Sequence, residues 1–294
     1  MNSAIRAVMP GGDCHPELSS SVQFDREEDP IAQISEFVAA FEAKTGGFNA
    51  FGLAVPGLVD IRENRIVYAP RQPKLENSDL AAALGEATGK KVFLENDANA
   101  AAYSELKCGS AGGSENFFYL TVGSGVGGAL VLGGEIWHGV SGFAGEFGFI
   151  SIDSDGRHLE DVASADGIVA RAKRRLHQDP ASTLFEVGEE NLTFEDILSA
   201  AIKEDGLAEL MLERTGMFIG NAVAGVINLL NIEKIIVGGE ILRAGDIVVD
   251  AIRSRASELS FEPAFRAVSI ESAKLGEDAA ANGAALLAAF RHGN

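Results

Sequence analysis

Two carboxylates flank a glycine-rich turn in the stretch of the chain from residue 94 to residue 148. The first, Asp97, follows an apolar run and opens an alanine-rich segment, and the second, Glu146, lies between small and apolar residues. A carboxylate can take a proton from a hydroxyl group when it is held within about 3 Å of that group. The backbone N–H groups of a glycine-rich turn can face an anion. These residue types are therefore the parts needed to hold a polyol beside a polyphosphate.

The glycine run itself, Gly123–Gly128, contains the spacing GxGxxG, which marks dinucleotide-binding sites when a helix follows it. Here the next residues, Ala129–Gly134, predict a strand and a turn, so no helix N-terminus would hold a pyrophosphate and we reject a Rossmann site. A structural hairpin rarely needs four glycines together with two small hydroxyl residues, Thr121 and Ser124. A phosphate-binding loop is therefore favoured over a plain turn.

Asp97 lies where a predicted strand passes into a predicted helix, with Asn96 and Asn99 beside it. Taken alone, Asp97 would be interpreted as a helix cap, because Asn and Asp are frequent at cap positions. The density of polar residues around this one strand end is greater than capping requires. A strand–helix corner would also hold a general base rigidly against a substrate. The combination favours a base at Asp97.

Two acids and a glycine pair carry weaker signals. Glu146 in its apolar setting would be costly if it were buried without a partner, so a polar partner such as a sugar hydroxyl is expected. Glu160 is ambiguous, because acids are common at helix starts. For Gly238 and Gly239, which end an apolar strand, close approach of a flat ligand and packing of the strand against a helix explain the glycines equally well. We interpret His138 as local packing rather than chemistry.

The composition of the whole chain restricts its function. At 294 residues, two domains or one elaborated α/β domain are expected. A net charge of −19 argues against a nucleic-acid partner, which would need a basic surface. Cys14 and Cys108 match no metal or redox spacing and are expected to be reduced thiols of a cytoplasmic protein. No apolar stretch reaches about 18 residues and the first residues do not resemble a signal peptide, so no membrane partner is expected.

Runs with strand and helix periodicity alternate along the chain, which predicts an α/β sheet with functional loops at the carboxyl ends of its strands. A shift to glycine and serine predicts a boundary between an N-terminal α/β domain, 1–108, and a C-terminal α/β domain, 109–294, with the last helix expected to pack back on the first domain. Strands are expected at Ala4–Met9, Ser19–Phe24, Ala50–Val55, Lys91–Leu94, Phe117–Val122, Ala129–Leu132 and Lys234–Val237. Helices are expected from Pro30, at Ser78–Gly89, Asp97–Lys107 and Ala163–His177, from Thr193 with Asp196 as its cap partner, and at Ala208–Asn231 and Asp278–Arg291.

Six segments, in this order, resemble the motifs of the ROK family, which is named for repressors, open reading frames and sugar kinases. The resemblance covers nearly the whole chain. The segments are Val55–Asp60, which resembles the family's PGxVD loop, Asn96–Ala100 (NDANA), Thr121–Gly128 (the second phosphate loop, TxGTGxGGG), Gly145–Gly148 (GExGH), Leu159–Ser164 (LExxxS) and Asn231–Gly239 (NPxxIxxGG).

The resemblance implies an actin-like ATPase fold of ribonuclease H type, in which two α/β domains enclose a cleft for sugar and ATP. It implies a kinase that transfers the γ-phosphate of ATP to a hydroxyl of a hexose or N-acetylhexosamine, with Mg²⁺ accompanying the ATP and a homodimer as the expected assembly. Asp97 would be the catalytic base. The resemblance assigns the sugar to Asn96, Glu146, Glu160 and Gly57, the phosphates to Thr121, Gly123, Ser124, Gly125 and Gly127, and the adenosine to Gly238 and Gly239.

Three features depart from the family pattern. The family's first phosphate loop, DxGGT, which helps to hold magnesium-ATP, should end where Met1–Ala4 stand, so its leading strand and loop are missing from the sequence. The histidine of the GExGH motif is replaced by Phe149. The cysteines of the family's structural zinc site are absent. His158, which stands at the position of the last one, cannot build a four-ligand site alone, so no structural zinc is expected.

Three interpretations therefore stay open. In the first, the chain is a sugar kinase whose catalysis is weakened by the lack of the first phosphate loop, since positioning and electrostatics supply most of the catalysis of phosphoryl transfer. In the second, it is a sugar-binding protein without catalysis, akin to the effector half of the family's repressors but without their DNA-binding domain. In the third, the true start lies upstream of Met1 and the protein is an ordinary kinase.

Overall fold

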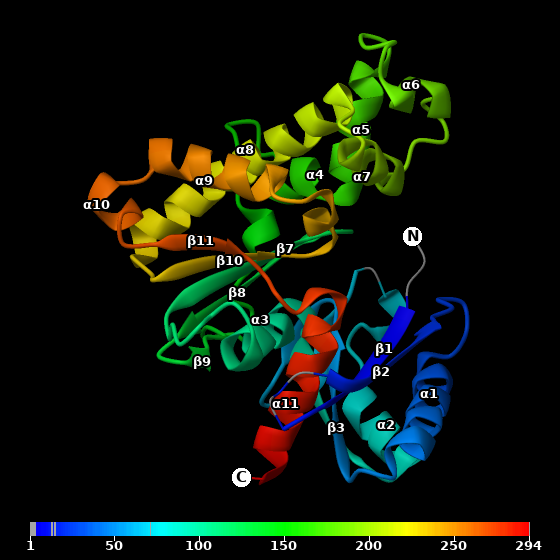
Figure 1. Cartoon of the computed structure of the whole chain (residues 1–294). Helices are drawn as coiled ribbons and strands as arrows, with labels where there is room; N and C mark the ends of the chain where they lie inside the picture. The colour runs from blue at the N-terminus through cyan, green and yellow to red at the C-terminus, as the bar shows by residue number, and fades with distance from the viewer. Residues whose placement is uncertain (1–3, 13, 15, 71, 294) are drawn as a thin grey trace. The chain divides into compact units, whose positions relative to one another are not determined.

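The computed structural model of the chain describes residues 4–12, 14, 16–70 and 72–293, so Met1–Ser3, where the resemblance places the end of a missing loop, lie outside the described residues. The chain forms two compact units (Figure 1). Each unit is built from segments that are distant in the sequence. Unit 1 consists of Met1–Glu115, Ala129–Gly145 and Lys274–Asn294, and unit 2 of Asn116–Gly128 and Glu146–Ala273.

In the described part of unit 1, three strand pairs precede the first candidate site, two of them antiparallel and one parallel. The parallel pair places Val55 opposite Asn96, so the loops that follow its two strands begin at the same edge. The pairs are β1 (Ala4–Pro10) with β2 (Pro16–Gln23), β4 (Leu58–Asp60) with β5 (Arg65–Tyr68), and β3 (Ala50–Val55) with β6 (Lys91–Asn96).

Local sequence explains where the helices of unit 1 begin and end. The first of them is capped by Asp29, which accepts a hydrogen bond from the Ile31 N–H at 3.1 Å, and it ends at Gly46, whose φ is 81°. Pro30 at the first helical position has a backbone already suited to the helix. The helices are α1 (Pro30–Thr45), α2 (Leu80–Thr88), α3 (Asp97–Cys108) and α11 (Ala279–Gly293).

The last helix, α11, packs against α3 and β3 of the same unit, as Figure 1 shows with α11 in red. Glycines permit the close packing. A Cβ atom on Gly283 would lie 1.7 Å from the Ala100 carbonyl oxygen, and one on Gly52 would lie 1.9 Å from the Ala284 carbonyl oxygen. Because α11 also contacts β6, residues near the end of the chain take part in the structure around the end of that strand.

The sheet of unit 2 is built around β10 (Lys234–Gly238), which lies parallel between β7 (Phe117–Val122) and β11 (Ser269–Ser272). The apolar residues in the middle of β10 are fully buried, as expected for a strand with neighbours on both sides. β8 (Val126–Leu132) follows β7 in the strand order. The part of β8 from Ala129 onward belongs to unit 1, as does β9 (Glu135–Ile136), with which its last residues pair.

Helices make up most of the rest of unit 2, and in Figure 1 α8 and α9 lie on one side of its sheet. α8, with 25 residues, is long and apolar enough to cross a membrane by length and composition, but 56% of its most apolar window is buried inside the fold. Its apolar side chains therefore contribute to the core of the unit. The helices are α4 (Leu159–Ala163), α5 (Ala165–Leu176), α6 (Thr183–Val187), α7 (Phe194–Ile202), α8 (Gly206–Leu230), α9 (Ile247–Leu259) and α10 (Glu262–Phe265).

Many of the expected elements are confirmed, and the differences have local causes. β3 and β7 have the predicted bounds, and Thr193 and Asp196 form the predicted capping box of α7. The sequence predicts one strand from Ala129, whereas β8 begins at Val126, so part of the glycine run is strand rather than turn. The helix predicted from Ala163 to His177 is interrupted, because Ser164 ends α4 and caps α5 through the Gly167 N–H.

Candidate functional site

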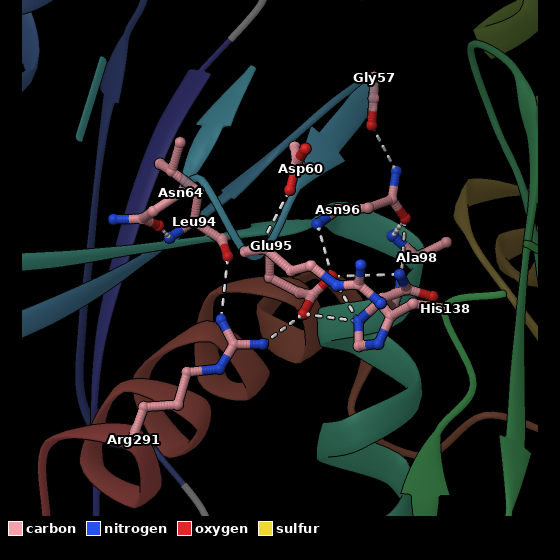
Figure 2. Close-up of polar contacts among 11 residues, drawn as sticks. Gly57, Asp60, Asn64, Leu94, Glu95, Asn96, Ala98, His138 and Arg291 are labelled. Atoms are coloured by element: carbon pink, nitrogen blue, oxygen red, sulfur yellow. Dashed lines mark hydrogen bonds and ion pairs between the residues drawn. The ribbon is translucent and has the colours of Figure 1, made fainter. Parts of the chain in front are cut away.

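The end of β6 is fixed by the amide side chain of Asn96. Its Oδ1 accepts hydrogen bonds from the backbone N–H groups of Ala98 at 2.9 Å and Asn99 at 3.1 Å, which makes Asn96 the cap of α3. Its Nδ2 donates to the carbonyl oxygen of Gly57 at 3.0 Å, in the loop after β3 (Figure 2). One side chain thus joins the loops that follow the two parallel strands.

Asp97 is the first residue of α3 and is half-buried. Its Oδ1 accepts a hydrogen bond from the Ala98 N–H at 2.9 Å. The interpretation of Asp97 as the helix cap is wrong, because Asn96 occupies the cap position. The structure therefore brings Gly57, Asn96 and Asp97 together at one corner of unit 1, where a carboxylate is held close to the N-terminus of a helix.

Directly before this corner, Glu95 is a buried acid, with only 1% of its surface exposed. Its carboxylate contacts Nε2 of His138 at 3.1 Å and accepts hydrogen bonds from Nη2 of Arg291 at 2.9 Å and Nδ2 of Asn99 at 3.1 Å (Figure 2). Burial raises the pKa of the Glu95 carboxyl, but the hydrogen bond and charge of His138 and the charge of Arg291 lower it more, so the pKa lies below its usual value.

Two of the partners of Glu95, His138 and Arg291, come from segments that the sequence does not connect with this corner. Arg291 lies in α11 and also donates from Nη1 to the carbonyl oxygen of Leu94 at 3.1 Å, so the end of the chain holds the end of β6. His138 lies in the loop after β9, and its interpretation as local packing alone is incomplete. The only sequence signal for this cluster is an acid inside an apolar strand end. We name Glu95, His138 and Arg291 the buried acid cluster.

In unit 2 the glycine loop is shorter than the sequence predicts. Because β8 begins at Val126, Gly127 lies in a strand and the loop is reduced to residues 123–125. Inside the loop, the N–H of Gly123 donates to the carbonyl oxygen of Gly125 at 3.0 Å. The carbonyl oxygen of Gly123 accepts a hydrogen bond at 2.8 Å from the N–H of Ala165, the first residue of α5.

Glu160 lies next to this loop rather than capping its helix. Its Oε2 accepts a hydrogen bond from the Val126 N–H at 2.8 Å, whereas Asp161 forms the capping box with His158. Gly148 allows the close approach here, since a Cβ atom on it would lie 2.4 Å from the Val126 carbonyl oxygen. The GExGH-like and LExxxS-like segments therefore meet at the start of β8.

The side chain of Glu146 is exposed, so burial is not what would require a polar partner for it. It precedes a short 3₁₀ turn, Phe147–Phe149, in which Phe147 and Gly148 are buried. The ring of Phe147 packs against that of Phe118 at 5.0 Å, so the apolar neighbours of Glu146 turn inward while the acid turns outward. The apolar setting in the sequence reflects its neighbours and not Glu146 itself.

The glycine pair after β10 is explained by packing. Gly238 pairs with Thr121 of β7, and a Cβ atom on it would lie 2.3 Å from the Tyr119 hydroxyl oxygen. Gly239 has φ of 96°, and a Cβ atom on it would lie 2.3 Å from the Val122 carbonyl oxygen. Contact with the strand β7, and not with a helix, already requires both glycines, so the glycines by themselves are no sign of a flat ligand.

Gly123 differs from that pair. Its φ lies outside the left-handed region, and the atoms nearest to a Cβ atom on it would be those of the Glu240 side chain, at an ordinary contact distance of 3.7 Å. The packing of unit 2 therefore does not require glycine at this position. A glycine that packing does not require, beside a side-chain carboxylate, is consistent with a loop that a ligand approaches closely.

The predicted site residues thus form two groups. Gly57, Asn96 and Asp97 lie together in unit 1. The group in unit 2 comprises Thr121, Gly123, Ser124, Gly125, Gly127, Glu146, Glu160, Gly238 and Gly239.

The chain is similar both to sugar kinases and to transcriptional repressors. The ROK family model matches residues 21–291. A glucokinase of Halalkalibacterium halodurans is 33% identical over 239 residues, which cover 78% of this chain and 72% of the relative. The xylose repressor of Bacillus subtilis is 25% identical over 268 residues, which cover 91% of this chain and 66% of the repressor.

A solved structure shows the same fold. The ROK family glucokinase from Streptomyces griseus, in complex with glucose and AMPPNP, superposes with a TM-score of 0.86 at 26% sequence identity. The superposition covers 98% of this chain and 96% of the glucokinase chain. The expected actin-like ATPase fold is thereby confirmed.

Proposed function

Since the chain belongs to the ROK family, we propose that it is an ATP-dependent kinase that phosphorylates a hydroxyl of a hexose or an N-acetylhexosamine. The observation that carries the proposal is the position of Asp97 beside Asn96. Asn96 caps α3, so the neighbouring carboxylate is not needed for capping and stands at a rigid strand–helix corner. Such a corner suits a general base.

In the proposed reaction, Asp97 takes the proton of the sugar hydroxyl. The hydroxyl oxygen then bonds to the γ-phosphorus of ATP while the bond from that phosphorus to the bridging oxygen breaks, which leaves ADP and a sugar phosphate. A positioned base contributes about 10²–10⁴-fold to the rate of such a step. Asn96 acts as a positioning residue, because it holds both the first turn of α3 and the loop at Gly57.

The phosphates of ATP are proposed to lie at the loop of residues 123–125, with Thr121 and Gly127 beside it and the adenosine near Gly238 and Gly239. This placement is supported by Gly123, because the packing of unit 2 does not require a glycine there. Glu240 lies at the same loop and would repel bound phosphates unless a cation stood between them. Mg²⁺ commonly binds through one or two carboxylates together with substrate phosphates, and when bound it neutralises their charge.

The sugar is proposed to contact Asn96, Gly57, Glu146 and Glu160. Support comes from the exposed side chain of Glu146, which a ligand can reach, and from the hydrogen bond of Val126 to Glu160, which fixes that carboxylate in place. The proposal includes a cytoplasmic homodimer and no structural zinc. At the position of the family's zinc ligands, the rings of Phe149 and His158 contact each other at 5.3 Å between centroids.

The alternative is a sugar-binding regulator without catalysis. The similarity to the xylose repressor over 91% of this chain favours it, because a repressor can share this fold. The two functions differ in one measurable respect. A kinase releases ADP in proportion to the sugar supplied, whereas a regulator binds the sugar and releases none.

A coupled assay for ADP release, run with a panel of hexoses and N-acetylhexosamines, tests the proposal. The protein is expected to turn over at least one of them. Asp97→Asn is expected to lower turnover by about 10²–10⁴-fold and to change sugar affinity far less. Asp79→Asn, at an exposed acid at the start of α2, is the matched control and should keep full turnover. Full turnover in the Asp97 variant would remove the proposed base, and sugar binding without any ADP release would establish the regulator.

A further inference from the structure

Four arginine side chains surround one cavity between α5 and α8 of unit 2. The cavity has a volume of about 200 Å³. Since a water molecule occupies about 30 Å³ in the liquid, this space corresponds to roughly six or seven waters and can hold a phosphate-sized group. The residues that line the cavity are Arg171, Arg174 and Arg175 of α5 and Met211, Arg214 and Phe218 of α8.

None of these four arginines pairs with a carboxylate among the residues that the structure describes. Elsewhere in the chain, arginines such as Arg243, Arg266 and Arg291 each pair with a glutamate. The chain as a whole carries a net charge of −19, so acids are abundant. A group of four cations without a counter-charge is therefore exceptional in this protein.

Arg171 is the best-held member of the group. Its Nε donates to the carbonyl oxygen of Val162 at 3.0 Å, and its Nη2 donates to the carbonyl oxygen of Met211 at 3.3 Å and to the hydroxyl of Thr215. Its guanidinium carbon lies 5.5 Å from the centroid of the Phe218 ring. Nη1, in contrast, is buried and has no hydrogen-bond partner in the described structure. A buried charged donor without a partner is costly unless something else satisfies it.

We propose that this cavity is a binding site for a small phosphate-bearing anion. Guanidinium groups bind phosphate oxygens with paired, charge-assisted hydrogen bonds, and several of them can neutralise the two charges of a phosphomonoester. Arg171 supplies a fixed donor, while the exposed side chains of Arg174 and Arg214 can close over the anion. The small volume and the acidity of the whole chain favour a small anion over a nucleic acid.

The proposed anion site is distinct from the candidate phosphate loop. The loop contacts the first residue of α5, Ala165, whereas the arginines of α5 lie in its second half. The chemistry of the site does not depend on the proposed kinase activity. Free phosphate and a phosphorylated sugar could both supply the same phosphate group.

Calorimetric titration of the full chain tests the proposal with three probes, inorganic phosphate, pyrophosphate and glucose 6-phosphate, each in chloride buffer of matched ionic strength. The double variant Arg174→Gln/Arg214→Gln removes two exposed arginines without touching the hydrogen bonds of Arg171. The control Arg157→Gln/Arg266→Gln changes the net charge equally but removes two carboxylate-paired arginines of the same unit. Thermal unfolding verifies that both variants fold.

At least one probe is expected to bind, to lose about tenfold or more of its affinity in the Arg174/Arg214 variant, and to keep its affinity in the control. A loss confined to glucose 6-phosphate would identify a sugar phosphate as the ligand, and an equal loss for all probes would identify the phosphate group alone. The proposal is overturned if no probe binds, if the cluster variant binds like the wild type, or if both variants lose affinity equally. Duplex DNA, titrated in parallel, would overturn it by binding through these arginines in place of the small anions.

Discussion

Arg291 in unit 1 and Arg171 in unit 2 hold the backbone in the same way but have opposite electrostatic surroundings. Arg291 donates to the carbonyl oxygen of Leu94 at 3.1 Å, and Arg171 donates to that of Val162 at 3.0 Å. Arg291 also binds the buried carboxylate of Glu95. Arg171 instead shares its cavity with three other arginines.

The two arginines differ in how the free-energy cost of removing a guanidinium group from water is compensated. A guanidinium removed from water needs a compensating charge. For Arg291 the compensating charge is the carboxylate of Glu95 in the same chain, and the buried acid cluster links α11 to β6. For Arg171, burial and then the charges of Arg214 and Arg174 lower the pKa to about 10, which still leaves the group protonated at neutral pH. The charge of Arg171 is therefore compensated only when the proposed anion binds from solution.

The largest expected effect comes from breaking the buried acid cluster. Arg291→Met keeps much of the side-chain volume but leaves the carboxylate of Glu95 without its arginine. Loss of one partner of a buried pair costs about 3–5 kcal/mol of unfolding free energy. Urea unfolding measures it, with Arg266→Met, which breaks an exposed pair, as the control and an expected cost of at most about 1 kcal/mol. Equal losses in the two variants would mean that water compensates Glu95.

Lowering the pH should remove part of the stabilisation that the Glu95 carboxylate contributes. The pKa of Glu95 lies below its ordinary value of 4.5, because His138 and Arg291 outweigh the effect of burial. A lowered folded-state pKa stabilises the protein above the unfolded-state value, and this contribution is lost as the pH falls below 4.5 through the folded-state pKa. The difference in unfolding free energy between the wild type and Glu95→Gln should therefore shrink between about pH 7 and about pH 3. A difference in unfolding free energy that stays constant over this range would show that the pKa of Glu95 is not lowered in the folded protein.

Much of the fold could be predicted from the sequence because its signals are local. Asp29, Pro30 and Gly46 determine the ends of α1, and apolar runs between polar turns determine β3 and β7. Short elements such as β4, β5 and β11 could not be predicted in this way, since three or four residues carry too little periodicity. α9 was missed although it is longer, because its charged residues interrupt the apolar pattern.

The candidate site was predictable only where neighbouring residues define it. Asn96 and Asp97 are adjacent in the sequence, so their common corner could be recognised. The buried acid cluster was not predictable, because Glu95, His138 and Arg291 are separated by tens to hundreds of residues and meet only when α11 packs back. The exposure of Glu146 could not be predicted for a related reason, since a pattern of apolar neighbours does not tell which way the acid itself turns.

Asn96 provides a smaller test within unit 1. Asn96→Ala removes the cap of α3 and the bond to Gly57, and a lost cap costs about 1 kcal/mol, up to about 2. Asn96→Asp keeps the capping oxygen and loses only the donor to Gly57, so its cost should be about half as large. Urea unfolding at neutral pH separates the two variants. Equal costs would show that the bond to Gly57, and not the cap, is what holds this corner.

The smallest expected effect lies in the arginine cluster and has the opposite sign. Without a bound anion, Arg174 and Arg214 add to the repulsion around Arg171. Replacing both with glutamine should therefore raise the unfolding free energy by a few tenths of a kcal/mol. The carboxylate-paired control Arg157→Gln/Arg266→Gln should not raise it, because each substitution removes an exposed ion pair.

Phosphate should make the wild type more stable than the Arg174→Gln/Arg214→Gln variant. An anion that binds only the folded wild type stabilises it by RT ln(1 + [L]/Kd), about 2.7 kcal/mol at a hundredfold excess over Kd, which exceeds the repulsion between the arginines. The Arg174/Arg214 variant should gain much less from the same concentration, so the wild type becomes the more stable protein. Urea unfolding in chloride buffer, with and without inorganic phosphate at matched ionic strength, measures the crossover. If phosphate stabilises both proteins equally, no anion binds at the four arginines. Arg171 and Arg291 would then differ only in that Arg291 has a carboxylate partner, Glu95, and Arg171 has none in the described part of the chain.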